Sequence, residues 1–141
     1  MVQAAYLPDI ANLEIPIDAW TKPFWDAAAE HRLLMPSCED CGRFRWPPGP
    51  FCPRCQSQKI RWSCPGSPRI YSFTVMQDAA GADGGQPRLH VPALIEFPEA
   101  DGVRLLAAVA GCPIAAIGIG SRVTVEWTKA ANATVPYFVI A

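Results

Sequence analysis

The most informative part of the sequence is Cys38-Glu-Asp-Cys41, then ten residues, then Cys52-Pro-Arg-Cys55. Zinc prefers four soft ligands in a tetrahedron, and thiolate is its favoured donor. Each Cys-x-x-Cys turn brings two sulfurs to one side of a metal. Gly42 can adopt the positive φ that such a turn needs, whereas Gln56 holds the equivalent place after the second pair. The pattern predicts a structural Zn²⁺ bound by Cys38, Cys41, Cys52 and Cys55, with no open coordination position for catalysis.

Other uses of the same four cysteines are two disulfides, four free thiols or an iron site of the rubredoxin type. Residues 1–11 lack the basic start and the long apolar core of a secretory signal, so we expect a cytoplasmic protein. In a reducing compartment, paired cysteines bind metal more often than they form disulfides. Nothing else in the sequence indicates electron transfer, which favours zinc over iron.

The remaining cysteines, Cys64 and Cys112, are interpreted as small buried hydrophobic residues. A nucleophilic cysteine needs a base, and neither cysteine is close in sequence to His31 or His90. The sequence therefore predicts no catalytic residue.

The composition excludes two classes of partner. A formal net charge of −1 and a pI near 6.1 give no electrostatic case for binding nucleic acid or an anionic membrane surface. No segment approaches the roughly 18 apolar residues of a membrane span. The 15 prolines and 10 glycines favour short strands and turns over long helices.

The first predicted unit, residues 1–35, is an extended lead-in followed by a helix. Thr21 is a candidate N-cap, and a proline in the first helical turn lacks only an N–H that would have no partner there. Four residues then share one helical face, at positions i, i+3, i+4 and i+7: Phe24, Ala27, Ala28 and His31. His31 is expected to close the helix, where the helix dipole favours a positive charge.

Residues 36–64 form the predicted zinc ribbon, with 44–46 as one hairpin arm and 60–62 as the return strand. The aromatic residues of this segment are expected to pack the module. Its basic residues have two interpretations, a phosphate-binding patch or a solvated face that balances the negative charge of a four-thiolate zinc centre. They are Arg43, Arg45, Arg54, Lys59 and Arg61.

Residues 65–141 are predicted to form five antiparallel strands. The expected strands cover residues 70–76, 92–97, 103–109, 122–127 and 135–140, with a hairpin turn at 99–102 and a longer connector at 112–121. In the first strand, Tyr71, Phe73 and Val75 are expected on one face. This layout fits an OB-fold, a five-stranded Greek-key barrel, and an open five-stranded sandwich equally well.

Taken together, these segments resemble an acyl-CoA-associated family in which a rubredoxin-like zinc ribbon precedes an OB-fold. The resemblance covers about Pro16 to Phe138. It is carried by Thr21-Lys-Pro-Phe-Trp25, Arg32-Leu-Leu34, Cys38-x-x-Cys41-Gly42, Trp46-Pro-Pro48, Phe51-Cys-Pro-x-Cys55, Trp62, Ile70-Tyr-Ser-Phe-Thr-Val75, Val103-Arg-Leu105, Gly118-Ile-Gly120 and Val123-x-Val125.

The resemblance implies a non-catalytic accessory subunit that forms a hetero-oligomer, a heterotetramer, with a thiolase-fold enzyme. Such enzymes include thiolases, acyltransferases and aldolases that cleave acyl-CoA side chains, as in steroid breakdown. We expect the barrel and the loop from Asp78 to His90 to face the partner, with Arg88 and His90 near its active-site mouth. The alternatives are a stand-alone acyl-CoA-binding module and a nucleic-acid binder, and the net negative charge after Cys64 disfavours the latter.

Overall fold

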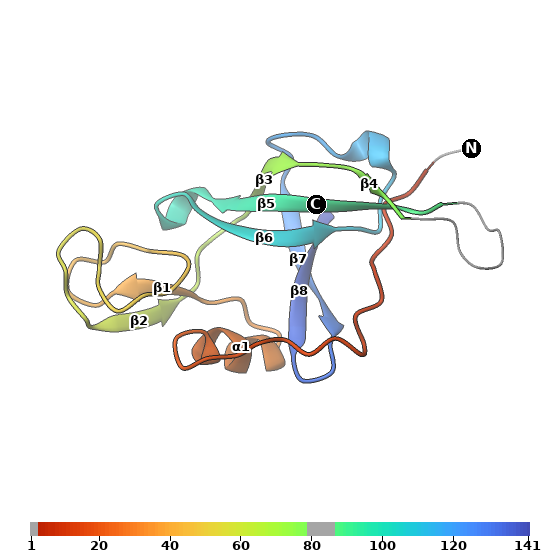
Figure 1. Ribbon diagram of the computed structural model, residues 1–141. Helices are drawn as coiled ribbons and strands as arrows, with labels where there is room; N and C mark the ends of the chain where they lie inside the picture. The colour runs from red at the N-terminus through yellow and green to blue at the C-terminus, as the bar shows by residue number, and fades with distance from the viewer. Residues whose placement is uncertain (1–2, 79–86) are drawn as a thin grey trace.

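The structure, a computed structural model, describes residues 3–78 and 87–141 and is mainly β. The α-helix α1 lies beside a two-stranded ribbon, β1–β2, and both pack near a barrel-like sheet (Figure 1). Two short 3₁₀ helices, η1 (Pro98–Ala100) and η2 (Ile114–Ala116), lie between barrel strands. This architecture confirms the predicted N-terminal helix, zinc ribbon and OB-fold barrel. Among the described residues, no helix is long and apolar enough to cross a membrane.

Helix α1 spans Lys22–Ala29 and buries Phe24, Ala27 and Ala28, as its apolar spacing predicts. Thr21 precedes it without a side-chain cap, because the Thr21 hydroxyl oxygen accepts from the Asp18 N–H at 3.2 Å instead of from the helix. His31 closes the helix, as predicted, although it lies two residues beyond the last helical residue. It adopts φ +58°, its N–H donates to Ala28 O, and the Arg32 N–H donates to Ala27 O, which is a common way to end a helix. The His31 ring stacks on Trp127 with centroids 5.6 Å apart.

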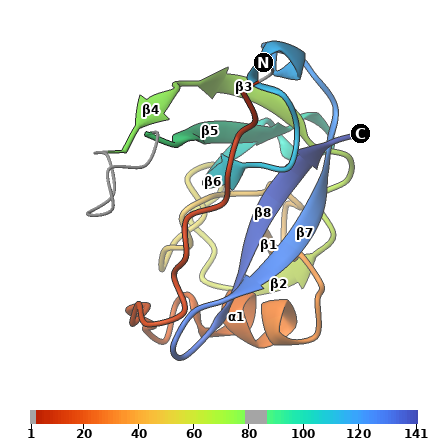
Figure 2. The ribbon, with the colours of Figure 1, turned by 90° about the vertical axis from the view of Figure 1, so that its right-hand side faces the viewer.

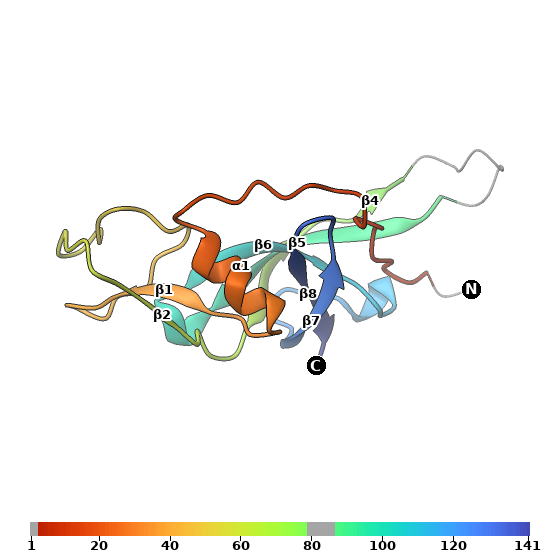
Figure 3. The same ribbon diagram turned by 90° about the horizontal axis from the view of Figure 1, so that it is seen from below.

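The ribbon pairs β1 (Met35–Cys38) with β2 (Ile60–Ser63) in antiparallel register. The predicted hairpin arm at 44–46 is confirmed in part: Phe44 bridges to Ser37 and Arg45 N–H donates to Pro36 O, but the segment does not form a regular strand. Pro36 lies inside β1 and does not interrupt it, since a narrow two-stranded sheet loses little from one missing N–H. Figure 3 shows α1 between this ribbon and β7–β8.

The barrel sheet follows the order β3-β5-β6-β8-β7, with the short β4 also paired to β5. Its strands are β3 (Arg69–Phe73), β4 (Met76–Gln77), β5 (Leu89–Phe97), β6 (Val103–Val109), β7 (Val123–Lys129) and β8 (Thr134–Ile140). A bridge between Arg69 of β3 and Arg122, the residue before β7, joins the two ends of this order and closes the barrel. The pairing is not wholly antiparallel as predicted, because β6 and β8 pair in parallel at Val109 and Phe138.

The first predicted barrel strand, 70–76, is divided into β3 and β4. The register shifts between Ile70 and Ser72, so Tyr71 turns outward and is 41% exposed instead of sharing an inner face with Phe73. Strand β5 also begins three residues before the predicted Pro92, at Leu89. Most of the predicted loop 78–88, residues 79–86, lies outside the described residues.

One continuous apolar core fills the barrel and extends to the helix and ribbon through Phe24 and Met35. The lead-in is extended, as predicted, and is held on the barrel by backbone hydrogen bonds from Ala5 N–H to Cys112 O and from Tyr6 N–H to Leu89 O. Figure 2 shows this segment running from the barrel down to α1. The fully buried core residues of the barrel are Ile70, Val91, Ile95, Phe97, Val109 and Phe138.

Candidate metal centre

The four predicted ligands, Cys38, Cys41, Cys52 and Cys55, meet at one point of the ribbon. Their sulfur atoms all lie within 4.8 Å of one another, with Sγ–Sγ distances of 3.5 Å for Cys38–Cys55 and 3.6 Å for Cys41–Cys52. Zinc–thiolate bonds of about 2.3 Å in a tetrahedron require sulfur separations of roughly 3.8 Å. The spacing and the donor set therefore fit one zinc ion.

Two turns of the same shape present these sulfurs. Gly42 N–H donates to Cys38 O, and Gln56 N–H donates to Cys52 O, each at 2.8 Å. Gly42 adopts φ +80°, as its position after the first pair predicts, and Gln56 adopts φ +63° without being a glycine. The geometry of the turn thus holds at the second knuckle, at the cost of an unfavourable conformation for glutamine.

Backbone N–H groups prepare the cysteines to bind a cation. The Cys41 N–H, 3.4 Å from Cys38 Sγ, lowers the pKa of Cys38 to about 6, and the Cys55 N–H lowers the pKa of Cys52. At Cys55 the Ser57 N–H lowers the pKa, but the neighbouring sulfur of Cys38 and burial outweigh it and raise the pKa to about 12. A divalent cation removes that repulsion between thiolates, so the cluster is chemically complete only with a metal.

The predictions for the basic residues of the ribbon have different outcomes. Arg43 and Lys59 lie on the surface within 3.9 Å of Asp101 and Asp40, respectively. Arg45 is only 7% exposed, so it belongs to neither a phosphate patch nor a solvated face. Nothing local in the sequence distinguishes it from its neighbours.

The two cysteines outside the cluster also differ from each other. Cys112 is half-buried, and burial raises the pKa of its thiol. Cys64 is exposed, so its predicted burial was wrong, because it lies in the segment between ribbon and barrel.

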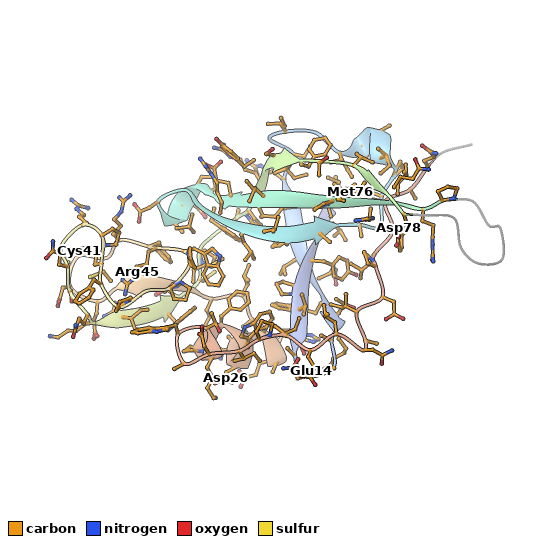
Figure 4. All side chains as sticks on the ribbon, in the orientation of Figure 1. Glu14, Asp26, Cys41, Arg45, Met76 and Asp78 are labelled. Atoms are coloured by element: carbon orange, nitrogen blue, oxygen red, sulfur yellow. The ribbon has the colours of Figure 1, made fainter. Side chains whose placement is uncertain are left out.

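The predicted contact residues Arg88 and His90 belong to a second group of polar residues, which we call the hairpin-base cluster and which also contains Tyr6 and Asp78. The Tyr6 hydroxyl donates to Asp78, and the Arg88 guanidinium lies 4.7 Å from the centre of the Tyr6 ring. His90 Nδ1 lies 3.1 Å from Asp78 Oδ1 without hydrogen-bond alignment. Figure 4 places Asp78 where β4 leads into the grey trace.

Tyr6 and Asp78 were not predicted as site residues. They are separated by 72 positions in the sequence. Only the extended path of the lead-in across the barrel brings them together, and no local pattern indicates that path.

A half-open apolar cavity of about 320 Å³ lies where the lead-in, α1, the ribbon and the barrel meet. Aromatic side chains form much of its wall, and no charged side chain lines it. The aromatic residues are Phe24, Trp25, Trp46 and Tyr137.

The fold and the cysteine cluster define a zinc-ribbon protein with an attached OB-fold barrel. Two family models match consecutive parts of the chain and together span more than half of it. They are the ChsH2 rubredoxin-like zinc ribbon domain over residues 25–61 and the ChsH2 C-terminal OB-fold domain over residues 64–128. The chain belongs to this ChsH2-type family, which confirms the resemblance and the zinc cofactor predicted from the sequence.

Solved structures agree with this assignment. A chain of the Ltp2-ChsH2(DUF35) aldolase superposes with a TM-score of 0.75 at 29% identity, over 90% of this chain and 98% of that one. A DUF35-family protein of unknown function from Sulfolobus solfataricus matches with a TM-score of 0.60 at 17% identity, over 87% and 86% of the two chains, and shows the fold alone.

A curated relative from Thermomonospora curvata is named "Probable enoyl-CoA hydratase alpha subunit". It is 34% identical over 120 residues, which cover 82% of this chain but only 36% of the relative. The chain thus spans about a third of that protein's length.

Proposed function

We propose that this chain is a zinc-binding accessory subunit that binds and completes a thiolase-fold enzyme acting on acyl-CoA. The observation that carries the proposal is the likeness to nearly the whole of one chain of the Ltp2-ChsH2(DUF35) aldolase. The Thermomonospora curvata relative is named as a subunit of an enoyl-CoA hydratase, which supports the same class of substrate, a CoA ester.

In this proposal the zinc is structural and is held by Cys38, Cys41, Cys52 and Cys55. Four thiolates fill a tetrahedral zinc ion, so no position is left for substrate or water. The metal fixes the two knuckles and thereby the shape of the ribbon. It supplies a folding constraint and no reaction step.

The absence of a catalytic role rests on the arrangement of candidate nucleophiles and bases. Among the described residues, no cysteine makes a hydrogen bond to a histidine, which a cysteine–histidine catalytic pair requires. Four of the six cysteines belong to the metal cluster. In this proposal, the reacting groups of the complex come from the partner.

We place the partner against the barrel end that carries the hairpin-base cluster. Arg88 contacts the Tyr6 ring and His90 lies beside Asp78 at this end. Neither Arg88 nor His90 is fully buried, so both can be reached by a partner. A guanidinium and an imidazole can donate hydrogen bonds to a partner carboxylate or to a phosphate of CoA.

The test is co-expression of a tagged form of this chain with a thiolase-fold protein from the same source. We expect a stable complex with one zinc per copy of this chain and a light-scattering mass equal to two copies of each subunit. Arg88→Ala and His90→Ala should reduce recovery of the partner. Lys22→Ala, which removes an exposed positive charge on the distant α1, should not (Figure 1). Purification of a zinc-loaded chain without any thiolase-fold protein would count against the proposal.

A second function, a stand-alone acyl-CoA-binding module, is favoured by the apolar cavity of about 320 Å³, which suits an acyl chain. The ribbon has few cations free to bind the phosphates of CoA, because Arg45 is buried and Arg43 and Lys59 already have acidic neighbours. Titration of the isolated chain with acyl-CoA separates the two functions. Saturable binding by the chain alone supports the module, and binding only by the complex supports the accessory subunit.

A further inference from the structure

Arg45 is a buried cation without an anionic partner. The residue as a whole is only 7% exposed. The Nη2 atom donates to Gly49 O at 3.0 Å, while Nε and Nη1 are fully buried and make no hydrogen bond. Arginine keeps its charge under all ordinary conditions, so burial cannot be relieved by losing a proton.

The position of Arg45 relates it to both halves of the cysteine cluster. Its segment runs beside β1, with Arg45 N–H donating to Pro36 O and Cys38 N–H donating to Arg43 O. Its guanidinium reaches the Gly49 carbonyl, three residues before Cys52. The cation therefore lies between the strand that ends in one ligand and the loop that leads to another, and Figure 4 shows Arg45 and Cys41 in the same small module.

The other basic residues of the ribbon do not share this environment. Arg43, Arg54, Lys59 and Arg61 are all exposed. Among the described residues, no carboxylate lies within 4.0 Å of Arg45, whereas Arg43 and Lys59 each have one. Solvent and salt screen the exposed charges, but they screen a buried charge much less.

The source of negative charge in the ribbon that can offset Arg45 is the cysteine cluster, in which Cys38 and Cys52 are buried, Cys41 is half-buried and Cys55 is exposed. Four thiolates around Zn²⁺ carry a net charge of −2. A buried charge is retained in proteins only where an opposite charge or hydrogen bonds compensate its desolvation. We propose that Arg45 is the internal counter-charge of the tetrathiolate zinc centre and tightens zinc binding. This inference rests on the zinc site of the proposed function.

The test measures zinc transfer from the full-length chain to a chromophoric chelator. Arg45→Met keeps most of the side-chain volume and removes the charge. We expect zinc release at least about tenfold faster than in the wild type, because a unit charge acts strongly on a doubly charged centre at low effective dielectric. Arg61→Met is the matched control, since it removes an exposed cation from the same module and should leave the rate unchanged.

Two further measurements separate charge from packing. Arg45→Lys keeps the charge and should restore slow release, even though it loses the planar fork. With Co²⁺ in place of zinc, Arg45→Met should move the sulfur-to-metal charge-transfer band to lower energy, because a nearby cation no longer stabilises the sulfur electrons. The band intensity also reports whether the tetrahedral site assembles.

The outcomes distinguish this inference from the proposed function. Equal release rates for Arg45→Met and Arg61→Met, or equally fast release from Arg45→Met and Arg45→Lys with the tetrahedral Co²⁺ spectrum intact, would overturn the role of Arg45 and leave the zinc site standing. A wild-type chain that binds no zinc would instead overturn the zinc site itself.

Discussion

The ribbon and the barrel reach a defined structure by different means. The ribbon has two strands of four residues, and much of its interior is cysteine sulfur around a metal site. The barrel buries Val91, Ile95, Phe97 and Phe138 completely. A small module cannot bury enough apolar surface to offset its conformational entropy, so it depends on metal binding, whereas the barrel depends on its core. One short chain thus combines two different sources of stability, although its apolar core is continuous.

Removal of a zinc ligand should have the largest effect, and it should act on the ribbon and not on the barrel. Cys41→Ser or Cys52→Ser should release zinc and unfold the ribbon, because metal binding supplies most of the folding free energy of so small a module. The barrel should keep its slowly exchanging amides. Metal analysis measures the loss of zinc. Residue-resolved hydrogen exchange of β1 reports on the ribbon, and that of β6 reports on the barrel. Cys64→Ser, outside the cluster, is the control, and retained zinc with an unchanged melting curve in the ligand variants would refute the prediction.

A cavity in the barrel core should have the opposite effect. Phe138 is fully buried in β8, and Phe138→Ala should lower the free energy of unfolding by about 3–5 kcal/mol. Zinc content should not change, because the substituted side chain is remote from the metal. Urea denaturation with parallel zinc analysis checks both statements. Leu106→Ala, at a position that is 70% exposed, should change stability by no more than about 0.5 kcal/mol.

The smallest expected effect concerns the junction between the two regions. Asp101, in the turn between β5 and β6, accepts a hydrogen bond from Phe44 N–H at 2.9 Å. Asp101 adopts φ +57°, a conformation that glycine tolerates, so Asp101→Gly should remove the contact without straining the turn.

We expect Asp101→Gly to lower the free energy of unfolding by about 1 kcal/mol, the typical value of one hydrogen bond, and to separate the unfolding of ribbon and barrel. Asp101→Asn keeps an acceptor oxygen and a tolerance for positive φ, so its free energy of unfolding should lie between those of Asp101→Gly and the wild type. Calorimetry of the three proteins measures the change. Identical transitions in all three would show that this contact does not couple the regions.

The features that sequence analysis predicted are those carried by short spacings. The Cys-x-x-Cys pairs, the Gly42 turn and the helical face of Phe24 each depend on neighbours within a few residues. Alternation of polar and apolar residues located most of the barrel strands. The bulge after Ile70 was not predictable in this way, because it depends on pairing with β5.

The features that were missed depend on distant parts of the chain. Arg45 is buried beside the loop that contains Gly49, whereas an arginine in the sequence alone indicates a surface residue. The parallel pairing of Val109 with Phe138 follows from barrel closure and not from either strand alone. Tertiary context of this kind overrides local propensity.

The central claim is tested by measuring acyl-CoA turnover by the thiolase-fold partner. The partner is assayed by itself and again after addition of the zinc-loaded chain. We predict that this chain alone has no activity and that the partner becomes more active or more stable when it is added. The Cys41→Ser variant should fail to give this gain. Turnover by the isolated chain, or a partner whose activity and melting temperature are unaffected by it, would contradict the account.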